Sequence, residues 1–491
     1  MGVLQLFILV PSGEVLLKSR YTRSRFVRLL RLAVEDSASR RGVRLVSWSV
    51  EGGRVFVGLE PGDVEVLTRV FGVYRAIRIR GVLEGFSGLE EIAEWAERLA
   101  AGLVEGKTFA VRPRRVGRHS FTSLDVAREV GARLKPYSRG VDLENPEVEV
   151  YIEVRGRRAY LYTGSDMYSG PGGLPPGSEG RALILYSGGI DTPAAAWMTA
   201  KRGVLVDFLH MVVSTPSSAY YAIRSASRLA RQWLHGYRPR MTIIHAGEAI
   251  LEIQRRMPKR VWMPCFKTLL YLEAARRRGY EAIATGESIG QTSSQTLHNL
   301  HAIHAALAPR LTAPVLRPLA GLDKEEITGL TRMIGLYEEA SKTPEYSALA
   351  RRGASPHVSP GELRACIDLA ENMSAPETTI DLLSEDWSTY LQKAPITIRY
   401  IPCNAELYYT GEPEYIHPDA QPITSLKPRP LDPTPIVIYS QDPDEAAEKA
   451  RELRRMKIHA YALALTPSQL RRLEETGGAR IRIEPGEKKH G

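Results

Sequence analysis

Hydrophobic and polar positions in the first part of the chain follow two different periods. Short apolar or alternating runs predict strands, and longer runs with an apolar residue every three or four positions predict helices. Strands are predicted at residues 4–10, 43–50 and 54–60, and a helix at 22–42 lies between the first two. The order of one strand, one helix and two strands predicts a small α+β module.

A second group of elements begins near residue 70. Its strands and helices are predicted at 73–84, 88–105, 107–115, 123–137 and, as a strand pair, within 148–164. This group predicts a second α+β unit. We therefore expect a first domain at residues 1–60 and a second at 61–167.

The stretch 170–180, "GPGGLPPGSEG", is dense in glycine and proline and marks the main domain boundary, with a linker at 168–178. After it, predicted strands and helices alternate at 182–187, 192–203, 204–212, 219–234, 240–246, 267–279 and 281–288. Buried strands alternating with helices predict a doubly wound, mostly parallel sheet over 179–375. Ligands of such sheets bind at the carboxyl ends of the strands. A last domain is expected at 380–491.

Composition narrows the classes of protein that remain. A chain of 491 residues predicts three or four domains, and 43% hydrophobic with 25% charged residues is typical of a globular protein. The net charge of +10 favours an anionic partner, nucleic acid ahead of a membrane surface. No run reaches the roughly 18 apolar residues of a membrane span, and we expect a cytoplasmic protein.

Cysteine is rare in the chain. Cys265, Cys366 and Cys403 lie far apart and form no C-x-x-C spacing. Neither a disulfide framework nor a zinc site is expected from this spacing.

The stretch 182–193, "ALILYSGGIDTP", carries the main candidate chemistry. Gly188 and Gly189 follow a predicted buried strand and allow backbone amides to approach an anion at a helix N-terminus. Two hydroxyls, those of Ser187 and Thr192, can donate to the same phosphate. Asp191 fits a magnesium ion that accompanies the phosphate, or a helix cap. The alternative is an ordinary strand-to-helix turn capped by this aspartate.

Basic side chains cluster after the predicted strand 107–115. They are Arg112, Arg114, Arg115, Arg118 and His119. Arginine forks suit phosphate oxygens, so this cluster is a candidate contact for nucleic acid. The alternative is a solvated strand edge.

Several motifs together resemble one family. "SGGIDT" resembles the S-G-G-x-D-S loop of ATP pyrophosphatase-type (PP-loop) enzymes, with threonine for the last serine. "ATGESIGQTSSQTLHNL" and "VLRPLAGLDKEEI" closely resemble the tRNA 4-thiouridine synthetases, also called tRNA sulfurtransferases. Upstream, "EVLLKSRYTRSRF" and "EGKTFAVRPRRVGRHSFTSLDVAREVGARL" resemble that family's N-terminal ferredoxin-like domain and its THUMP RNA-binding domain. The resemblance covers residues from about 5 to 350.

The resemblance implies an enzyme that binds ATP, Mg²⁺ and tRNA. It adenylates the C4 oxygen of a uridine, expected to be uridine 8, and then replaces that oxygen with sulfur. Family members also pair as homodimers. Carried onto this sequence, the implied ATP contacts are Ile184, Leu185, Ser187, Gly188, Gly189, Asp191, Thr192, Phe208, Leu209, Lys267, Gly286 and Gln295. Asp191 is also the implied metal ligand, and Asp191 and Ser187 are catalytic candidates.

The chain departs from the family at the positions that carry sulfur. Ser347 replaces the cysteine of the bacterial "PEYC" motif, and a serine hydroxyl cannot form a persulfide. Some archaeal members use a C-x-x-C pair, of which Trp262 replaces the first member and Cys265 remains. One thiolate does not anchor an iron-sulfur cluster, so none is expected. Cys265 is a catalytic candidate as a sulfur carrier, and its alternative is a small buried apolar residue.

Residues from about 380 onward resemble a rhodanese domain without its reactive cysteine. Ser440 stands in the place of that cysteine, and Asp442, Asp444 and Glu445 would disfavour a thiolate nearby. We therefore expect sulfur from sulfide or from an external carrier. Two alternatives remain open: a tRNA-adenylating enzyme with a non-sulfur nucleophile, and a non-catalytic tRNA-binding protein.

Overall fold

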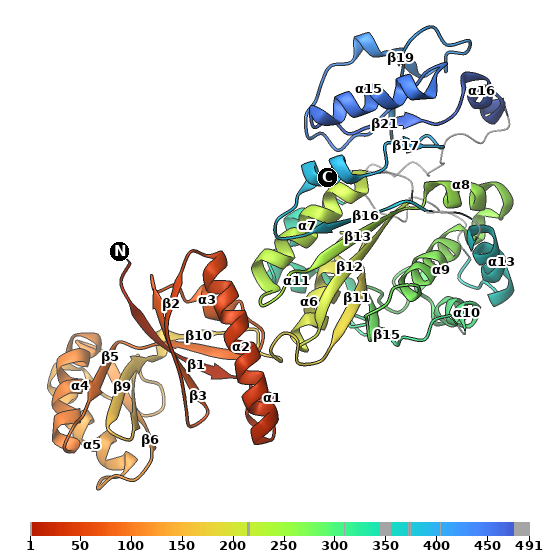
Figure 1. The fold of residues 1–491 in the computed structure, drawn as a ribbon. Helices are drawn as coiled ribbons and strands as arrows, with labels where there is room; N and C mark the ends of the chain where they lie inside the picture. Colours follow the sequence, from red (N-terminus) through yellow and green to blue (C-terminus); the bar gives the residue numbers. More distant parts are fainter. Residues whose placement is uncertain are drawn as a thin grey trace. The chain divides into compact units, whose positions relative to one another are not determined.

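The computed structural model describes residues 2–213, 217–308, 310–343, 355–371, 373, 375–402 and 404–475 (Figure 1). The chain divides into two units. Unit 1 consists of Met1–Ser178, Lys201–Gly203 and His235–Tyr237, and unit 2 contains the remaining residues.

The first sheet of unit 1 is antiparallel and has the strand order β10-β4-β1-β3-β2. Its strands are β1 (Gln5–Pro11), β2 (Arg44–Glu51), β3 (Arg54–Glu60), β4 (Val73–Arg78) and β10 (Met167–Ser169). Its helices are α1 (Gly13–Leu16), the long α2 (Arg20–Arg40) and α3 (Glu65–Thr68). Leu30 and Val34 of α2 pack against Phe7, Leu9 and Val57 of the sheet in a buried core.

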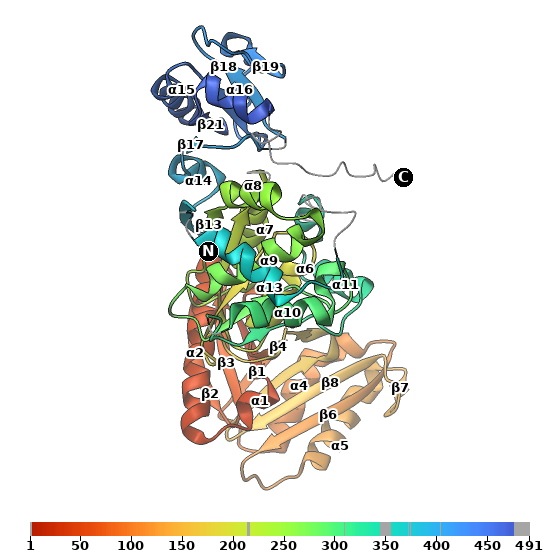
Figure 2. The ribbon, with the colours of Figure 1, turned by 90° about the vertical axis from the view of Figure 1, so that its right-hand side faces the viewer.

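The second sheet of unit 1 has the order β5-β9-β8-β6-β7. Its strands are β5 (Gly81–Glu84), β6 (Thr108–Val116), β7 (Gly140–Val141), β8 (Val148–Arg155) and β9 (Arg158–Thr163). The helices α4 (Leu89–Val104) and α5 (Ser123–Leu134) contribute Ile92, Trp95 and Val130 to the core beneath this sheet. Figure 2 shows both helices on one side of the long strands β6 and β8.

The single strand expected at 73–84 is wrong, because the chain changes sheets within it. Strand β4 ends at Arg78 in the first sheet and β5 begins at Gly81 in the second. The buried carboxylate of Asp166 holds this crossing: Arg78 Nη2 lies 2.8 Å from Oδ1 and Arg80 Nε lies 2.5 Å from Oδ2. The expected boundary at residue 60 therefore falls inside the first sheet, whose strand β10 also reaches into the expected linker.

Unit 2 contains the predicted doubly wound sheet, with the strand order β15-β14-β11-β12-β13-β16. Its strands are β11 (Arg181–Leu185), β12 (Leu205–Val212), β13 (Arg240–His245), β14 (Ala282–Thr285), β15 (Val315–Leu316) and β16 (Glu377–Asp381). All pairings are parallel except that of β13 with β16. This sheet extends past residue 375, the expected end of its domain.

The helices of this sheet lie on both of its faces (Figure 1). They are α6 (Asp191–Lys201), α7 (Ser217–Trp233), α8 (Gly247–Arg256), α9 (Trp262–Ala275), α10 (Leu297–Leu307), α11 (Lys324–Met333), α12 (Tyr337–Ala340) and α13 (Pro360–Glu371). The strand order reverses beside β11: the chain moves from β11 through β12 to β13 and then returns to β14 on the other side. A crevice at the carboxyl ends of the strands is expected at such a reversal.

The second sheet of unit 2 is fully parallel and has the order β17-β21-β20-β18-β19. It contains β17 (Thr397–Ile398), β18 (Glu406–Tyr409), β19 (Ala420–Pro422), β20 (Ile436–Tyr439) and β21 (Ala460–Leu463), with helices α14 (Trp387–Lys393), α15 (Pro443–Arg455) and α16 (Pro467–Glu475). Among the described residues of the whole chain, no helix is long and apolar enough to cross a membrane.

Candidate active site

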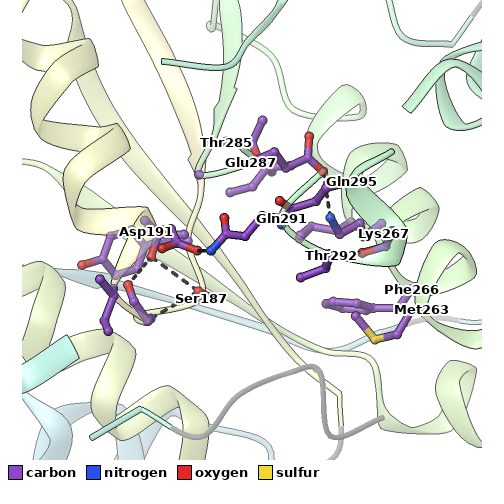
Figure 3. Close-up of a pocket in the computed structure, with 18 of the residues that line it drawn as sticks. Ser187, Asp191, Met263, Phe266, Lys267, Thr285, Glu287, Gln291, Thr292 and Gln295 are labelled. Carbon is purple, nitrogen blue, oxygen red and sulfur yellow. Dashed lines mark hydrogen bonds and ion pairs between the residues drawn. The ribbon is translucent and has the colours of Figure 1, made fainter. Parts of the chain in front are cut away.

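A pocket of about 680 Å³ opens at the carboxyl ends of β11, β12 and β14. Leu185, Leu209 and Met211 line it from the first two strands, and Thr285 lines it from the third. Helix α9 adds an apolar wall that includes Met263 and Phe266 (Figure 3). The predicted position of a ligand site, at the strand ends, therefore coincides with a large pocket.

The loop between β11 and α6 forms one end of the pocket and is closed by its own hydroxyls. The amide of Gly188 donates to Thr192 Oγ1 (3.1 Å), and the amide of Gly189 donates to Ser187 Oγ (3.2 Å). Gly188 has a φ of 87°, and a Cβ there would lie 2.8 Å from Ala222 Cα. Only glycine therefore fits this turn, and threonine supplies the hydroxyl that closes it.

Asp191 begins α6 and faces the pocket. Its Oδ1 accepts a hydrogen bond from Lys324 Nζ (2.9 Å), and its Oδ2 accepts one from Gln291 Nε2 (3.3 Å). The carboxylate is thus held toward the pocket by groups from two distant segments. This arrangement favours a role in binding over that of a simple helix cap.

The opposite wall contains a buried carboxylate, Glu287, which accepts three hydrogen bonds. They come from Tyr271 Oη (2.7 Å), Lys267 Nζ (3.0 Å) and Arg317 Nε (3.0 Å). Burial alone would raise the pKa of Glu287, but Lys267, Tyr271 and Arg317 outweigh it and hold the pKa below the usual range. Burial, with Glu287 beside the phenol, raises the pKa of Tyr271 well above its ordinary value. Glu287 is therefore ionised and Tyr271 is neutral at pH 7.

Two further predicted residues shape the pocket through the backbone. A Cβ on Gly286 would lie 3.1 Å from the backbone carbon of Asp191, so glycine allows the loop after β14 to approach α6. Gln295 closes the next loop, because its Oε1 accepts a hydrogen bond from the amide of Ser288 (3.2 Å).

Most of the predicted ATP contacts lie in this pocket. Those that line it are Leu185, Ser187, Gly189, Asp191, Thr192, Leu209, Lys267, Gly286 and Gln295. Ile184, Gly188 and Phe208 are buried and are not among its lining residues. Sequence reasoning did not name Glu287, Gln291 and Lys324, although all three fall within motifs quoted for the family resemblance.

The predicted basic cluster divides into separate groups. Arg112, Arg114 and Arg115 lie on β6, where β7 pairs only with Thr108 and Phe109. Arg112 Nε donates to Glu149 Oε1 (3.0 Å), whereas Arg114 and Arg118 are exposed. Arg115 Nη1 lies 3.3 Å from Nδ1 of His119, whose Nε2 bonds to the backbone oxygen of Gly156.

A cationic cavity of about 320 Å³ lies beside two of these arginines in unit 1. Arg112 and Arg114 line it together with Arg54 and Arg75, and with the aromatic rings of Tyr74, Tyr151 and Tyr162. Burial lowers the pKa of Arg54, whose Nε forms an ion pair with Glu153 Oε1 at 3.7 Å but makes no hydrogen bond among the residues that the structure describes. Arg115, Arg118 and His119 are not among the residues that line this cavity. Sequence reasoning missed Arg54 and Arg75, which come from the first sheet.

Comparisons with known proteins agree with these features. Family models of the thiamine biosynthesis protein ThiI and of the THUMP domain match residues 177–364 and 86–163. A tRNA sulfurtransferase of Desulfurococcus amylolyticus is 40% identical over 471 residues, which cover 93% of this chain and 96% of the relative. The chain belongs to the tRNA sulfurtransferase family.

Two further proteins, one known by its sequence and one by its structure, are similar to most of this chain. A tRNA sulfurtransferase of Pyrobaculum aerophilum is 41% identical over 370 residues, 74% of this chain and 73% of the relative. A solved 4-thiouridine synthetase, in complex with RNA and bound ATP, has a TM-score of 0.66 and 25% identity. It covers 77% of this chain, which in turn covers 100% of the solved chain. The predicted family and multidomain fold are thus confirmed.

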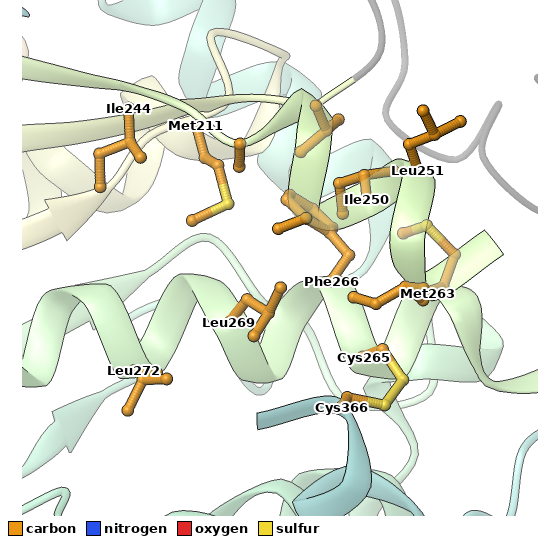
Figure 4. Close-up of a cluster of buried hydrophobic side chains, with 14 of the residues drawn as sticks. Met211, Ile244, Ile250, Leu251, Met263, Cys265, Phe266, Leu269, Leu272 and Cys366 are labelled. Carbon is orange, nitrogen blue, oxygen red and sulfur yellow. A yellow bond between two sulfur atoms is a disulfide. The ribbon is translucent and has the colours of Figure 1, made fainter. Parts of the chain in front are cut away.

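The cysteines of this sulfurtransferase depart from the sequence-based expectation. Cys265 of α9 and Cys366 of α13 form a disulfide, although none was expected from their spacing (Figure 4). Both residues are fully buried, and Cys265 is not among the residues that line the pocket. The fold brings together two positions that are 101 residues apart. A sulfur-carrier role for Cys265 stays a prediction that concerns its reduced thiol.

The other positions of interest are Cys403 and the two serines that stand in place of family cysteines, and the structure describes only one of the three. Ser347 and Cys403 lie outside the described residues. Ser440 follows β20 and precedes α15, where its Oγ donates a hydrogen bond to Glu445 and accepts one from the amide of Asp442 (3.3 Å). The acidic surroundings predicted for this serine are present, while the rhodanese-like nature of the second sheet of unit 2 stays a prediction.

Proposed function

We propose that this chain is an ATP-dependent tRNA sulfurtransferase that converts a tRNA uridine, expected to be uridine 8, to 4-thiouridine. The observation that carries the proposal is the loop 187–192 at one end of a 680 Å³ pocket, with Lys267 on the opposite wall. Family membership and the solved 4-thiouridine synthetase with RNA and bound ATP support it.

The pocket suits a reaction in two steps. In the first, the C4 oxygen of uracil attacks the α-phosphorus of ATP, and pyrophosphate leaves with the electrons of the broken P–O bond. In the second, a sulfur nucleophile adds to C4, and AMP leaves with the former carbonyl oxygen. Negative charge grows on the phosphates in the first step, where loop amides and the two lysines, Lys267 and Lys324, would stabilise it.

Asp191 is suited to be the protein ligand of a magnesium ion that also binds the substrate phosphates. Mg²⁺ is usually bound by one or two carboxylates together with substrate phosphates. Asp191 presents one carboxylate at the pocket, and its present contacts with Lys324 and Gln291 are side-chain contacts that a ligand can replace. When bound, the ion would neutralise phosphate charge beside this loop.

The cationic cavity of unit 1 suits the RNA. It combines guanidinium groups, which bind phosphate oxygens, with aromatic rings, on which unpaired bases stack. Arg114 is exposed at the edge of this cavity and is the principal phosphate contact that we propose.

The sulfur is proposed to come from sulfide or from an external carrier. The side chain at position 440 is a serine, and Cys265 is bonded to Cys366 in this structure. Neither of these two side chains can therefore carry a persulfide in the oxidised chain, and Ser347 lacks a thiol as well.

Nucleoside mass spectrometry tests the proposed function. Unmodified tRNA is incubated with the purified protein, ATP, Mg²⁺ and sulfide, and the digest is analysed for 4-thiouridine. The proposal expects 4-thiouridine in amounts that depend on ATP and on the protein. If AMP is released only with tRNA and no thiolated nucleoside forms, the nucleophile is not sulfur. If neither product forms, the chain is not a sulfurtransferase under these conditions and the proposal fails.

A further inference from the structure

Glu287 occupies an unusual position at the wall of the pocket. Its side chain is 7% exposed, yet its two oxygens accept hydrogen bonds from two cations, Lys267 and Arg317, and from the phenol of Tyr271. Figure 3 shows Lys267 and Glu287 joined on the side of the pocket opposite Asp191. Sequence reasoning assigned no role to this carboxylate.

The charges of this cluster do not cancel. One carboxylate faces one ammonium and one guanidinium, so the cluster carries a net charge of about +1. Lys267 and Glu287 line the pocket, whereas Arg317 bonds to Glu287 and is not among the lining residues. Without the carboxylate, these two half-buried cations would repel each other, because solvent screens their charges only in part. Glu287 therefore permits two cations to remain close together beside the pocket.

The same carboxylate fixes the place of the ammonium. Lys267 and Tyr271 are one helical turn apart on α9, and both bond to Glu287. Arg317 follows β15, which pairs with β14, the strand that leads to Glu287. A lysine side chain is flexible, and among the residues that the structure describes its ammonium is held by one oxygen, Oε1 of Glu287, which leaves its other protons available to a ligand.

We infer that Glu287 is a positioning residue of the thiolation reaction: it holds the Lys267 ammonium at the pocket wall, where that charge meets the phosphates during adenylation. This inference rests on the proposed function. Glu287 itself touches no reacting atom. Its contribution is the fixed position of a neighbouring charge, which matters most when charge develops in the transition state.

Steady-state kinetics of Glu287→Gln tests the inference in the full-length protein with tRNA, ATP, Mg²⁺ and sulfide. The amide keeps the shape of the side chain and removes its charge, so the net charge of the cluster changes from about +1 to about +2. Ground-state binding of anionic ATP should not weaken, whereas loss of the fixed ammonium should lower kcat about 100-fold. The expected result is therefore a fall in kcat with KM for ATP unchanged or lower.

Glu273→Gln is the matched control. Glu273 lies on the same helix and pairs with Arg276 and Arg277, away from the pocket. It should keep wild-type kcat and KM. A role of Glu287 in packing alone would instead raise KM and lower Tm, without a selective loss of kcat.

A double-mutant cycle with Lys267→Met completes the test. If Glu287 acts through Lys267, the double variant should be no slower than Lys267→Met alone. Independent, additive losses would overturn the inference, as would wild-type kcat in Glu287→Gln. Should Glu287→Gln not fold, Glu287→Asp keeps the charge but shortens the reach, and full kcat in that variant would also refute it. Wild-type protein is assayed in parallel, so a failure of the proposed function itself is seen separately.

Discussion

The disulfide between Cys265 and Cys366 should contribute strongly to the stability of unit 2. The two residues are 101 positions apart, and their Cα atoms are separated by 5.7 Å, within the usual span of a disulfide. Closing a loop of that length removes chain entropy from the unfolded state worth about 4.7 kcal/mol. Unit 2 has about 300 residues. With an unfolding entropy of roughly 2.1 cal/mol/K per residue, each kcal/mol shifts its Tm by roughly 1.5 °C, so Cys366→Ala should lower Tm by roughly 7 °C.

The assay compares thermal and urea unfolding of the wild type with Cys265→Ala, Cys366→Ala and the double variant. Either single substitution removes the same bond, so the double variant should be little less stable than each single one. Reduced wild-type protein should unfold like the variants. Thiol titration in denaturant without reductant should find one thiol per chain, that of Cys403. Three titratable thiols, or equal stability of oxidised and reduced wild type, would refute the reasoning.

Three further outcomes follow from the structure. Asp191→Ala should abolish AMP release with tRNA while tRNA affinity changes only a few fold, and turnover that survives would place the site elsewhere. Replacing Arg112 and Arg114 with glutamine should weaken tRNA binding and reduce the slope of log K against log salt by about two, so an unchanged slope would exclude both as phosphate contacts. Burial lowers the pKa of His210 to about 4 and that of His245 to about 3. The unfolded chain therefore binds more protons, and unfolding free energy should fall as pH drops from about 6.5 toward 4, while a flat profile would contradict this.

The sequence predicts the local parts of this molecule well. The strand, glycine loop and helix around Gly188 depend on neighbouring residues, and the structure has them as expected. Hydrophobic periodicity also predicts the alternating strands of unit 2, because each buried strand is apolar along its own length.

Contacts between residues far apart in the sequence could not be predicted from the hydrophobic pattern. Lys324 reaches Asp191 across 133 positions, and Arg317 reaches Glu287 only because β15 pairs with β14. The change of sheet between Arg78 and Arg80 leaves the apolar pattern unbroken, so periodicity could not show it. The pairing of Cys265 with Cys366 could not be predicted for the same reason. The spacing of cysteines along the sequence indicates only local pairings, whereas the fold determines which distant residues lie close together.

The antiparallel strand β16 determines where this protein can be shortened. It pairs Thr379 with Thr242 and Ile380 with Met241, and so covers the outer edge of β13. A truncated protein that ends at residue 375 would leave the backbone N–H and C=O groups of β13 open to another chain, which is a common cause of aggregation. A protein that ends after Lys393 keeps both β16 and α14. A protease that removes the C-terminal part and keeps the edge of β13 covered must therefore cut beyond that helix, and not at the border that the sequence motifs suggest.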